Sequence, residues 1–294
     1  MQSDLDKAPD GLWHYTDAGG LQGILEKEEL WASDTRFLND ATEINYGLEV
    51  AEEAVEVAAR SGRWKTSTNH FLQGVMASDG ANLTGFLRVR SEVYVACLCE
   101  NGDLLSQWRA YAGRDTAGGY ALQFRHRAPV TGWIDHLGRE KLQLQRVIYD
   151  RDKQLAAFSS LIELLAPVYD VDPSERRMNA VAKNLVDGVL EFATFCKHPS
   201  FREEGEWRVV YERSSDEKPL KVLRRISRGL FVPYVALELP AAVGAMAGHL
   251  PITEVRCGPS PEPKLKQDGV QRLLGSSKTF KHVKVSGSDS PLRL

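Results

Sequence analysis

The sequence predicts an α+β fold with mixed strands and an inserted helical segment. Three observations support this fold class. Short strand-like segments recur along most of the chain, and one of them, residues 93–99, is an almost unbroken apolar run typical of a strand covered on both faces. Residues 153–198 show the clearest helical spacing. No repeat or low-complexity linker divides the chain, so we expect one domain over residues 1–294 with a helical insertion at about 150–198.

The first third of the chain predicts alternating strands and helices. Residues 12–15 are a short apolar and aromatic strand, and Thr16 and Asp17 are suited to cap the helix that follows. That helix carries Leu21, Ile24 and Leu25 at helical spacing. Residues 30–33 predict the next strand. A longer helix follows it and ends near Gly62, whereas residues 64–84 carry little signal.

The middle of the chain adds strands around short helices. After the apolar strand 93–99, residues 104–111 predict a short amphipathic helix, and residues 120–124 and 142–149 predict strands. Residues 153–198 predict two helices separated at residues 170–173, where Pro173 disfavours a continuous helix. The remaining predicted strands are 206–211, 223–224, 234–237, 252–256 and 282–285, with a helix over 264–274.

The composition is that of an ordinary globular protein. Hydrophobic residues make up 43% and charged residues 26% of the 294 residues, and the formal net charge is −3. This charge gives no global reason to expect nucleic-acid or membrane binding. The cationic stretches 218–228 and 278–284 are more often solvated faces than nucleic-acid sites.

The cysteines and the N-terminus bear on the cellular compartment. The four cysteines lack metal-ligand spacing, so we expect reduced thiols and no metal. The N-terminal residues have neither a basic start nor an apolar core, and no stretch is long enough to span a membrane. We therefore expect a cytoplasmic protein with no membrane partner.

The first candidate site segment is His14-Tyr15-Thr16. On a strand, His14 and Thr16 share one face, so an imidazole and a hydroxyl point the same way. Together they are able to hydrogen-bond the hydroxyls of a ribose. The alternative is that His14 is a satisfied core histidine and Thr16 only caps the next helix.

The second segment is residues 201–208, where Glu203, Glu204 and Glu206 precede a strand. Carboxylates this close repel, so one has a raised pKa or a cation such as Arg208 holds them. We expect Glu204 and Glu206 to share one face of an extended segment, suited to orienting a ribose and stabilising an oxocarbenium-like centre. The alternative is a charged loop at a strand edge.

Two further segments offer aromatic and cationic groups. On a helix, Trp108 and Tyr111 lie three residues apart and present an aromatic face that can stack a flat ring, with Ser106 beside them. Core packing, with Ser106 as a cap, is the alternative. Arg36 is suited to bind a phosphate, while Asp40 begins a turn or caps a helix.

These segments together resemble a bacterial family of uncharacterised domains along the whole chain. The residues that carry the resemblance are His14-Tyr15-Thr16 with Leu21, Ile24 and Leu25, then Phe37-Leu38-Asn39-Asp40 and Glu43, Gln107-Trp108 with Tyr111-Ala112, Phe201 with Glu204 and Glu206-Trp207-Arg208, and Ser286 with Ser290-Pro291-Leu292-Arg293.

The N-terminal segment also resembles the first motif of ADP-ribosyltransferases, and Glu204-Gly205-Glu206 has the Glu-x-Glu form of one branch of that superfamily. The resemblance implies an ADP-ribosyltransferase-like fold in which His14 and Thr16 bind the ribose of NAD. It also implies that Trp108 and Tyr111 enclose nicotinamide and that Glu206 promotes its loss. The sequence departs from the pattern because it has no clear Ser-Thr-Ser segment and has a long helical insertion.

The leading functional hypothesis is therefore an NAD-dependent ADP-ribosyltransferase or NAD glycohydrolase, with NAD as a substrate. In it, Arg36 meets the pyrophosphate, Ser106 and Glu204 complete the site, and the acceptor is a protein, a nucleic acid or water. By resemblance, the context is bacterial stress or phage defence. The alternative is a non-catalytic protein that binds a ligand or partner in the same cleft. A metal-dependent nuclease built from Asp40, Glu43, Glu203 and Glu206 is a third hypothesis.

Overall fold

The computed structural model describes residues 9, 11–37, 42–77, 93–111, 118–125, 142–171, 175–212, 221–227, 229–238 and 249–290. Within these residues the chain forms helices and a large mixed sheet, which confirms the predicted α+β class. The chain divides into two compact units that interleave in sequence. The sheet unit comprises residues 1–34, 94–146 and 203–294, and the helical unit comprises residues 35–93 and 147–202.

The sheet unit begins with a strand, a helix and a second strand. Strand β1 (Gly11–Thr16) buries Leu12, Trp13 and Tyr15. Helix α2 (Ala18–Lys27) starts at Asp17, whose carboxylate accepts a hydrogen bond from the Gly20 N–H at 2.7 Å, as expected of a helix cap. Strand β2 (Glu29–Asp34) follows directly.

The other elements of the sheet unit complete one extended sheet. They are β3 (Val93–Cys99), α6 (Leu105–Tyr111), β4 (Tyr120–Arg125), β5 (Leu142–Arg146), β6 (Glu206–Glu212), β7 (Val222–Ser227), β8 (Leu230–Glu238), β9 (Ile252–Cys257), α10 (Pro263–Ser276) and β10 (Lys284–Gly287). The predicted strand 142–149 is shorter in the structure, because it ends at Arg146. Each of the other predicted strands has an observed counterpart at or within a few residues of the expected position.

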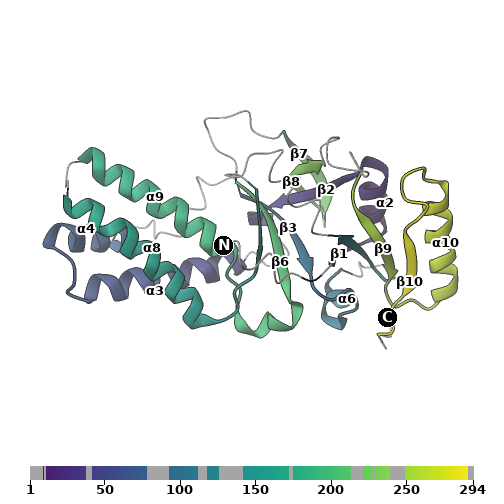
Figure 1. Ribbon diagram of the computed structural model, residues 1–294, viewed down its shortest axis with the longest axis horizontal. Coiled ribbons are helices and arrows are strands. Elements are labelled where there is room, and N and C mark those ends of the chain that lie inside the picture. The colour runs from purple at the N-terminus through teal and green to yellow at the C-terminus, as the bar shows by residue number, and fades with distance from the viewer. Residues whose placement is uncertain are drawn as a thin grey trace. The chain divides into compact units, whose positions relative to one another are not determined.

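The strand order explains how distant segments come together (Figure 1). The order is β10-β9-β4-β1-β3-β2-β8-β7, with β6 on β3 and β5 on β6. The pairings of β1 with β3 and β4, of β2 with β3 and β8, and of β4–β9, β5–β6 and β7–β8 are antiparallel, whereas β9 and β10 are parallel. The main core covers one face of this sheet and includes Leu12, Tyr94, Leu98, Trp207 and Val255. Strand β3 lies at the centre, as its apolar sequence predicts.

The helical unit has a core of its own. Its helices are α3 (Thr42–Arg60), α4 (Thr66–Ala77), α8 (Arg151–Val171) and α9 (Glu175–Thr194), with a short 3-10 helix, η1 (Thr35–Phe37), before them. Leu48, Val55, Phe158 and Val189 are among the residues buried between these helices. The two helices expected between residues 153 and 198 are observed as α8 and α9. Helix α4 lies within residues 64–84, where helical spacing is weak.

The cysteines and the helix lengths complete this description. All four cysteines are free thiols, and Cys97 alone among them is partly exposed. Among the helices that the structure describes, none combines the length and apolarity needed to cross a membrane.

Candidate functional site

His14 lies beside the part of β3 where the pairing partner of this strand changes from β1 to β2. Strand β1 pairs with β3 at Trp13 and Cys99, whereas β2 pairs with it at Ser33 and Val95. Cys97 falls between the two pairings. Its carbonyl oxygen lies 2.9 Å from Nδ1 of His14. We call the group formed by His14, Ser33, Cys97 and Arg225 the β1–β2 junction.

This contact fixes the tautomer of His14. A carbonyl oxygen only accepts hydrogen bonds, so neutral His14 carries its proton on Nδ1 and has Nε2 as a hydrogen-bond acceptor. Burial lowers the pKa of His14, and the positive charge of Arg225 acts in the same direction, while the hydrogen bond with Cys97 opposes them. The imidazole is therefore neutral at neutral pH.

Arg225 and Ser33 bring a cation and a hydroxyl to the junction. Arg225, on β7, donates from Nη2 to Oγ of Ser33 on β2 at 3.0 Å. Its guanidinium lies 5.8 Å from the ring centre of Trp31, and Trp31 in turn packs on Tyr234 with ring centres 4.9 Å apart. A guanidinium beside a hydroxyl is a common arrangement for binding phosphate groups.

Strand β6 brings the Glu203–Arg208 segment to the other edge of β3. The Glu100 N–H donates to the Gly205 carbonyl at 3.1 Å, and the Tyr94 and Tyr211 rings lie 6.2 Å apart at the far end of both strands. These contacts make β6 antiparallel to β3. Backbone groups of successive residues point to opposite edges of a strand, and Cys97 is three residues from Glu100, so the Cys97 carbonyl points away from β6. His14 and the start of β6 therefore flank the same strand, but they do not share a face of the sheet. His14 lies on the β1 face of Leu12, whereas Glu206 lies opposite Trp207, and Leu12 and Trp207 belong to the same main core.

Glu206 is buried in an ion pair. Its two carboxylate oxygens accept hydrogen bonds from Nε and Nη2 of Arg208 at 2.8 and 3.1 Å, and the two side chains are only 3% and 1% exposed. Both project from the face of β6 opposite Trp207, which belongs to the main core. The predicted role of Arg208 as the cation that holds a carboxylate of this segment agrees with this geometry.

Glu204 and Glu206 do not share one extended face, and that prediction is wrong. A 3-10 helix, η2 (Pro199–Glu204), runs through Glu204, and Gly205 then adopts a left-handed conformation with φ +51°. The backbone turns between the two glutamates. Glu203 is exposed, Glu204 is half-buried and Glu206 is buried.

Glu100 anchors this turn. Its carboxylate accepts hydrogen bonds from Nε1 of Trp207 at 3.0 Å and from Arg146, whose Nε lies 2.9 Å away. A side chain at Gly205 would approach the Glu100 carboxylate to 3.2 Å. Glu100 and Arg146 were not among the predicted site residues, because their contacts join strands far apart in sequence.

Thr16 lies beside the start of α2. A β-carbon added at Gly20 would be 1.9 Å from the Thr16 hydroxyl, so this hydroxyl packs against the first turn of the helix. Asp17, and not Thr16, makes the capping hydrogen bond. Thr16 is half-buried at the end of β1, two residues from His14.

Trp108 is fully buried, which favours core packing over stacking with a ligand. Its ring packs edge-on against Tyr15 with centres 4.7 Å apart, and its Nε1 donates to Asp103 at 2.6 Å. A β-carbon at Gly258 would be 2.7 Å from the Trp108 ring. Ser106 is half-buried in α6, and Tyr111 ends that helix with a side chain outside the described residues.

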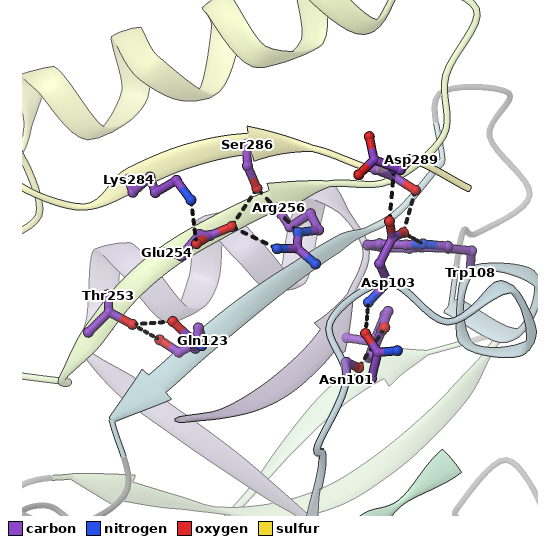
Figure 2. A network of polar contacts seen from close by, with 12 residues as sticks. Asn101, Asp103, Trp108, Gln123, Thr253, Glu254, Arg256, Lys284, Ser286 and Asp289 are labelled. Carbon is purple, nitrogen blue, oxygen red and sulfur yellow. Dashed lines mark hydrogen bonds and ion pairs between the residues drawn. The ribbon is translucent and has the colours of Figure 1, made fainter. Parts of the chain in front are cut away.

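A polar network holds the segment that leads into α6 (Figure 2). Asp103 accepts hydrogen bonds from Trp108, from the Ser288 hydroxyl and from the backbone N–H of Asp289. Tyr15 donates to the Asn101 carbonyl and accepts from the Leu104 N–H, both at 2.9 Å. The C-terminal segment after β10 therefore fixes the loop between β3 and α6.

A second part of the network lies between β9 and β10 (Figure 2). Glu254 accepts hydrogen bonds from Ser286, Lys284 and Arg256. Burial acts to raise the pKa of Glu254, but these three donors together outweigh it and leave the pKa lowered. Arg256 also stacks on Trp13 at 4.5 Å. The network lies on the β1 face that carries Trp13 and Tyr15, opposite Leu12.

The remaining predicted residues lie elsewhere or are not described. Arg36 is exposed in η1 and belongs to the helical unit. Asn39 and Asp40 lie outside the described residues, as does the side chain of Glu43 in α3. Among the residues that the structure describes, no group of three His, Cys, Asp or Glu side chains is arranged to hold a metal ion.

A groove of about 530 Å³ lies between α2 and α10 in the sheet unit. Leu21, Tyr120, Lys266 and Gly269 are among its lining residues, and none of the predicted site residues lines it. Lys266 donates to the Gly119 carbonyl at 2.8 Å, and burial lowers its pKa to about 8.

Comparison with known proteins finds a family similarity over part of the chain. Residues 107–209 match the model of a family described as "Protein of unknown function (DUF2971)". This part of the chain is similar to that family. The match runs from α6 to β6 and contains Trp108, Tyr111, Glu204 and Glu206. It confirms a resemblance to an uncharacterised domain family over this region. No curated protein matches the chain.

Proposed function

We propose that this protein is an NAD-dependent ADP-ribosyltransferase or NAD glycohydrolase. The observation that carries the proposal is the neutral His14 held by the Cys97 carbonyl. The Glu206–Arg208 pair lies on the other neighbour of β3 and on the other face of the sheet, so the role of Glu206 is a separate part of the proposal with a variant of its own. A fixed Nδ1–H tautomer leaves Nε2 to accept a hydrogen bond from a ribose hydroxyl. Thr16, two residues along β1, is proposed as the second ribose contact.

The charged residues have separate proposed roles. Arg225, which reaches Ser33, is proposed to bind the pyrophosphate of NAD because it lies in the same compact unit as His14. Arg36 is an exposed cation in the helical unit and remains a candidate for the same contact. Glu204, Ser106 and Tyr111 remain candidate contacts of the nicotinamide ribose and ring.

The proposed chemistry breaks the bond between ribose C1′ and the nicotinamide nitrogen. The bonding electron pair leaves with nicotinamide, and the ionised Glu206 stabilises the positive charge that develops on the ribose. Arg208 keeps Glu206 ionised within a buried site. Water, or a nucleophilic group of a protein or nucleic acid, then bonds to C1′ and loses a proton to solvent. The proposed context is bacterial stress or phage defence.

The test is release of free nicotinamide when the protein is incubated with NAD. We expect His14→Ala and Glu206→Gln to reduce release by at least about a hundredfold, the range typical of lost electrostatic stabilisation. Glu203→Gln is the matched control, because Glu203 is an exposed carboxylate three residues before Glu206. Thermal unfolding of each variant establishes that it is folded.

The outcomes separate the proposal from its alternative. Stabilisation of the folded protein by NAD without nicotinamide release in any condition indicates a non-catalytic NAD-binding protein. Absence of both stabilisation and release overturns the NAD assignment. Equal release by wild type and by folded His14→Ala and Glu206→Gln variants assigns the chemistry to other residues.

A further inference from the structure

The β7–β8 hairpin carries an apolar tip that no part of the described chain covers. Strand β2 pairs with β8 only from Glu238 to Tyr234, so the rest of β8 pairs with β7 alone. Ile226, Leu230 and Phe231 at the end of this two-stranded ribbon are 75%, 58% and 70% exposed. Exposed apolar side chains gathered at one point typically mark an interaction surface.

The tip is apolar on both of its faces. Ile226 pairs with Phe231, and Ser227 pairs with Leu230, in the last two rungs of the hairpin. Successive residues of a strand point to opposite faces, so Phe231 and Ile226 lie on one face and Leu230 on the other. A protein partner that packs on a sheet covers one face of it. The interior of a lipid bilayer instead surrounds an inserted hairpin on both faces.

Cations are frequent in the sequence of this hairpin and just before it. The sequence from residue 218 to residue 237 contains five cations, Lys218, Lys221, Arg224, Arg225 and Arg228, and no carboxylate. Arg224 is exposed and lies on the same face as Ile226, because the two are two residues apart on β7. This local positive charge contrasts with the net charge of −3 of the whole chain, which gives no global reason to expect membrane binding.

The spacing of tip and cations matches the depth of a lipid headgroup layer. A strand rises about 3.3 Å per residue, so Arg224 lies roughly 10 Å from the Ser227 rung. Interfacial membrane anchors bury their apolar part about 5–10 Å deep, with basic residues at the level of the phosphates. Apolar insertion and phosphate contact are therefore possible at the same time.

We propose that the β7–β8 hairpin binds the surface of an anionic lipid bilayer. Phe231, Ile226 and Leu230 enter the boundary of the acyl chains, and Arg224 contacts the lipid phosphates. Nucleic acid also attracts these cations, but it offers no apolar environment for Ile226 and Leu230. This inference is independent of NAD chemistry.

The experiment is co-sedimentation of the full chain with lipid vesicles. Wild type binds vesicles that contain phosphatidylserine in phosphatidylcholine, binds pure phosphatidylcholine much more weakly, and loses affinity as salt rises. Phe231→Ser weakens binding at least about tenfold through lost apolar burial. Arg224→Gln weakens binding about fivefold, and only on the anionic vesicles.

Matched controls exclude general effects of lost apolar surface or charge. Leu164→Ser removes an equally exposed apolar side chain from α8, and Arg272→Gln removes an exposed cation from α10; both bind like wild type. Circular dichroism establishes folding, which these exposed positions leave intact. Binding equal on neutral and anionic vesicles, no vesicle binding, or Phe231→Ser binding like wild type overturns the proposal. So does tight binding to RNA or DNA that Arg224→Gln weakens while vesicles remain unbound.

Discussion

Glu206 and Arg208 lie two residues apart on one face of β6 and form a bidentate ion pair that is almost completely buried. Removal of one partner from such a pair leaves a charge without its counterion in a site of low polarity. A substitution of Glu206 is therefore expected to change the stability of the protein as well as any chemistry at Glu206.

We expect Glu206→Gln to lower the free energy of unfolding by about 3 kcal/mol, because it leaves the Arg208 charge buried. The double variant Glu206→Leu with Arg208→Met removes both charges and is expected to be more stable than Glu206→Gln. Urea denaturation of both variants measures the difference. Urea denaturation of the single variants Glu206→Leu and Arg208→Met completes the comparison. A double variant whose loss of stability equals the sum of these two single losses contradicts the coupling.

His14 predicts a loss of stability in mild acid. Its pKa is lowered in the folded protein, so the unfolded chain binds a proton more readily as the pH falls below 6.5. The free energy of unfolding therefore falls as pH drops from 6.5 through the lowered pKa. Thermal unfolding of wild type and His14→Gln from neutral to mildly acidic pH tests this. The variant should show a shallower decline, and parallel curves contradict the prediction.

Asp103 predicts coupling between the C-terminal segment and α6. Asp103→Ala removes the acceptor of the buried Trp108 indole and of the Asp289 N–H, at a cost of about 1–3 kcal/mol. Hydrogen exchange at Asp289 and the fluorescence of tryptophan report the two losses. Asp268→Ala is the control, because its exposed pair with Arg272 is worth no more than about 0.5 kcal/mol. Unchanged exchange at Asp289 in Asp103→Ala contradicts the coupling.

Alanine substitution at two helical glycines is expected to have opposite effects on the free energy of unfolding. A β-carbon at Gly47 in α3 would lie 2.7 Å from the backbone of Ala193 in α9, so Gly47→Ala forces the helices of the helical unit apart. Nothing lies within 4 Å of a β-carbon at Gly269 in α10. We expect Gly47→Ala to destabilise by about 1–3 kcal/mol and Gly269→Ala to stabilise by about 0.5–1 kcal/mol. Thermal unfolding compares them, and equal shifts contradict the steric argument.

Local sequence patterns predicted the elements of the fold better than their arrangement. The apolar run 93–99 is observed as β3, and the two predicted helices within 153–198 are observed as α8 and α9. The pairing of β3 with β1, β2 and β6 joins segments far apart in sequence, which periodicity alone does not encode. For the same reason, the division into two interleaved units was not predicted.

The candidate site was predictable where its contacts are local. Arg208 as the partner of Glu206 follows from the period of a strand, because residues two apart share a face. Gly205 interrupts that period one residue earlier, so Glu204 was misplaced. The contact of Arg225 with Ser33 spans 192 residues and had no signal in the sequence.

The interleaving of the two units also bears on how the chain is made. Leu30 of β2 pairs with Leu237 of β8, so the ribosome must add about two hundred residues before that ladder closes. At 5–20 residues per second this takes roughly 10–40 s. During that interval the edge of the nascent strand that will pair with β8 is open to pairing with other chains.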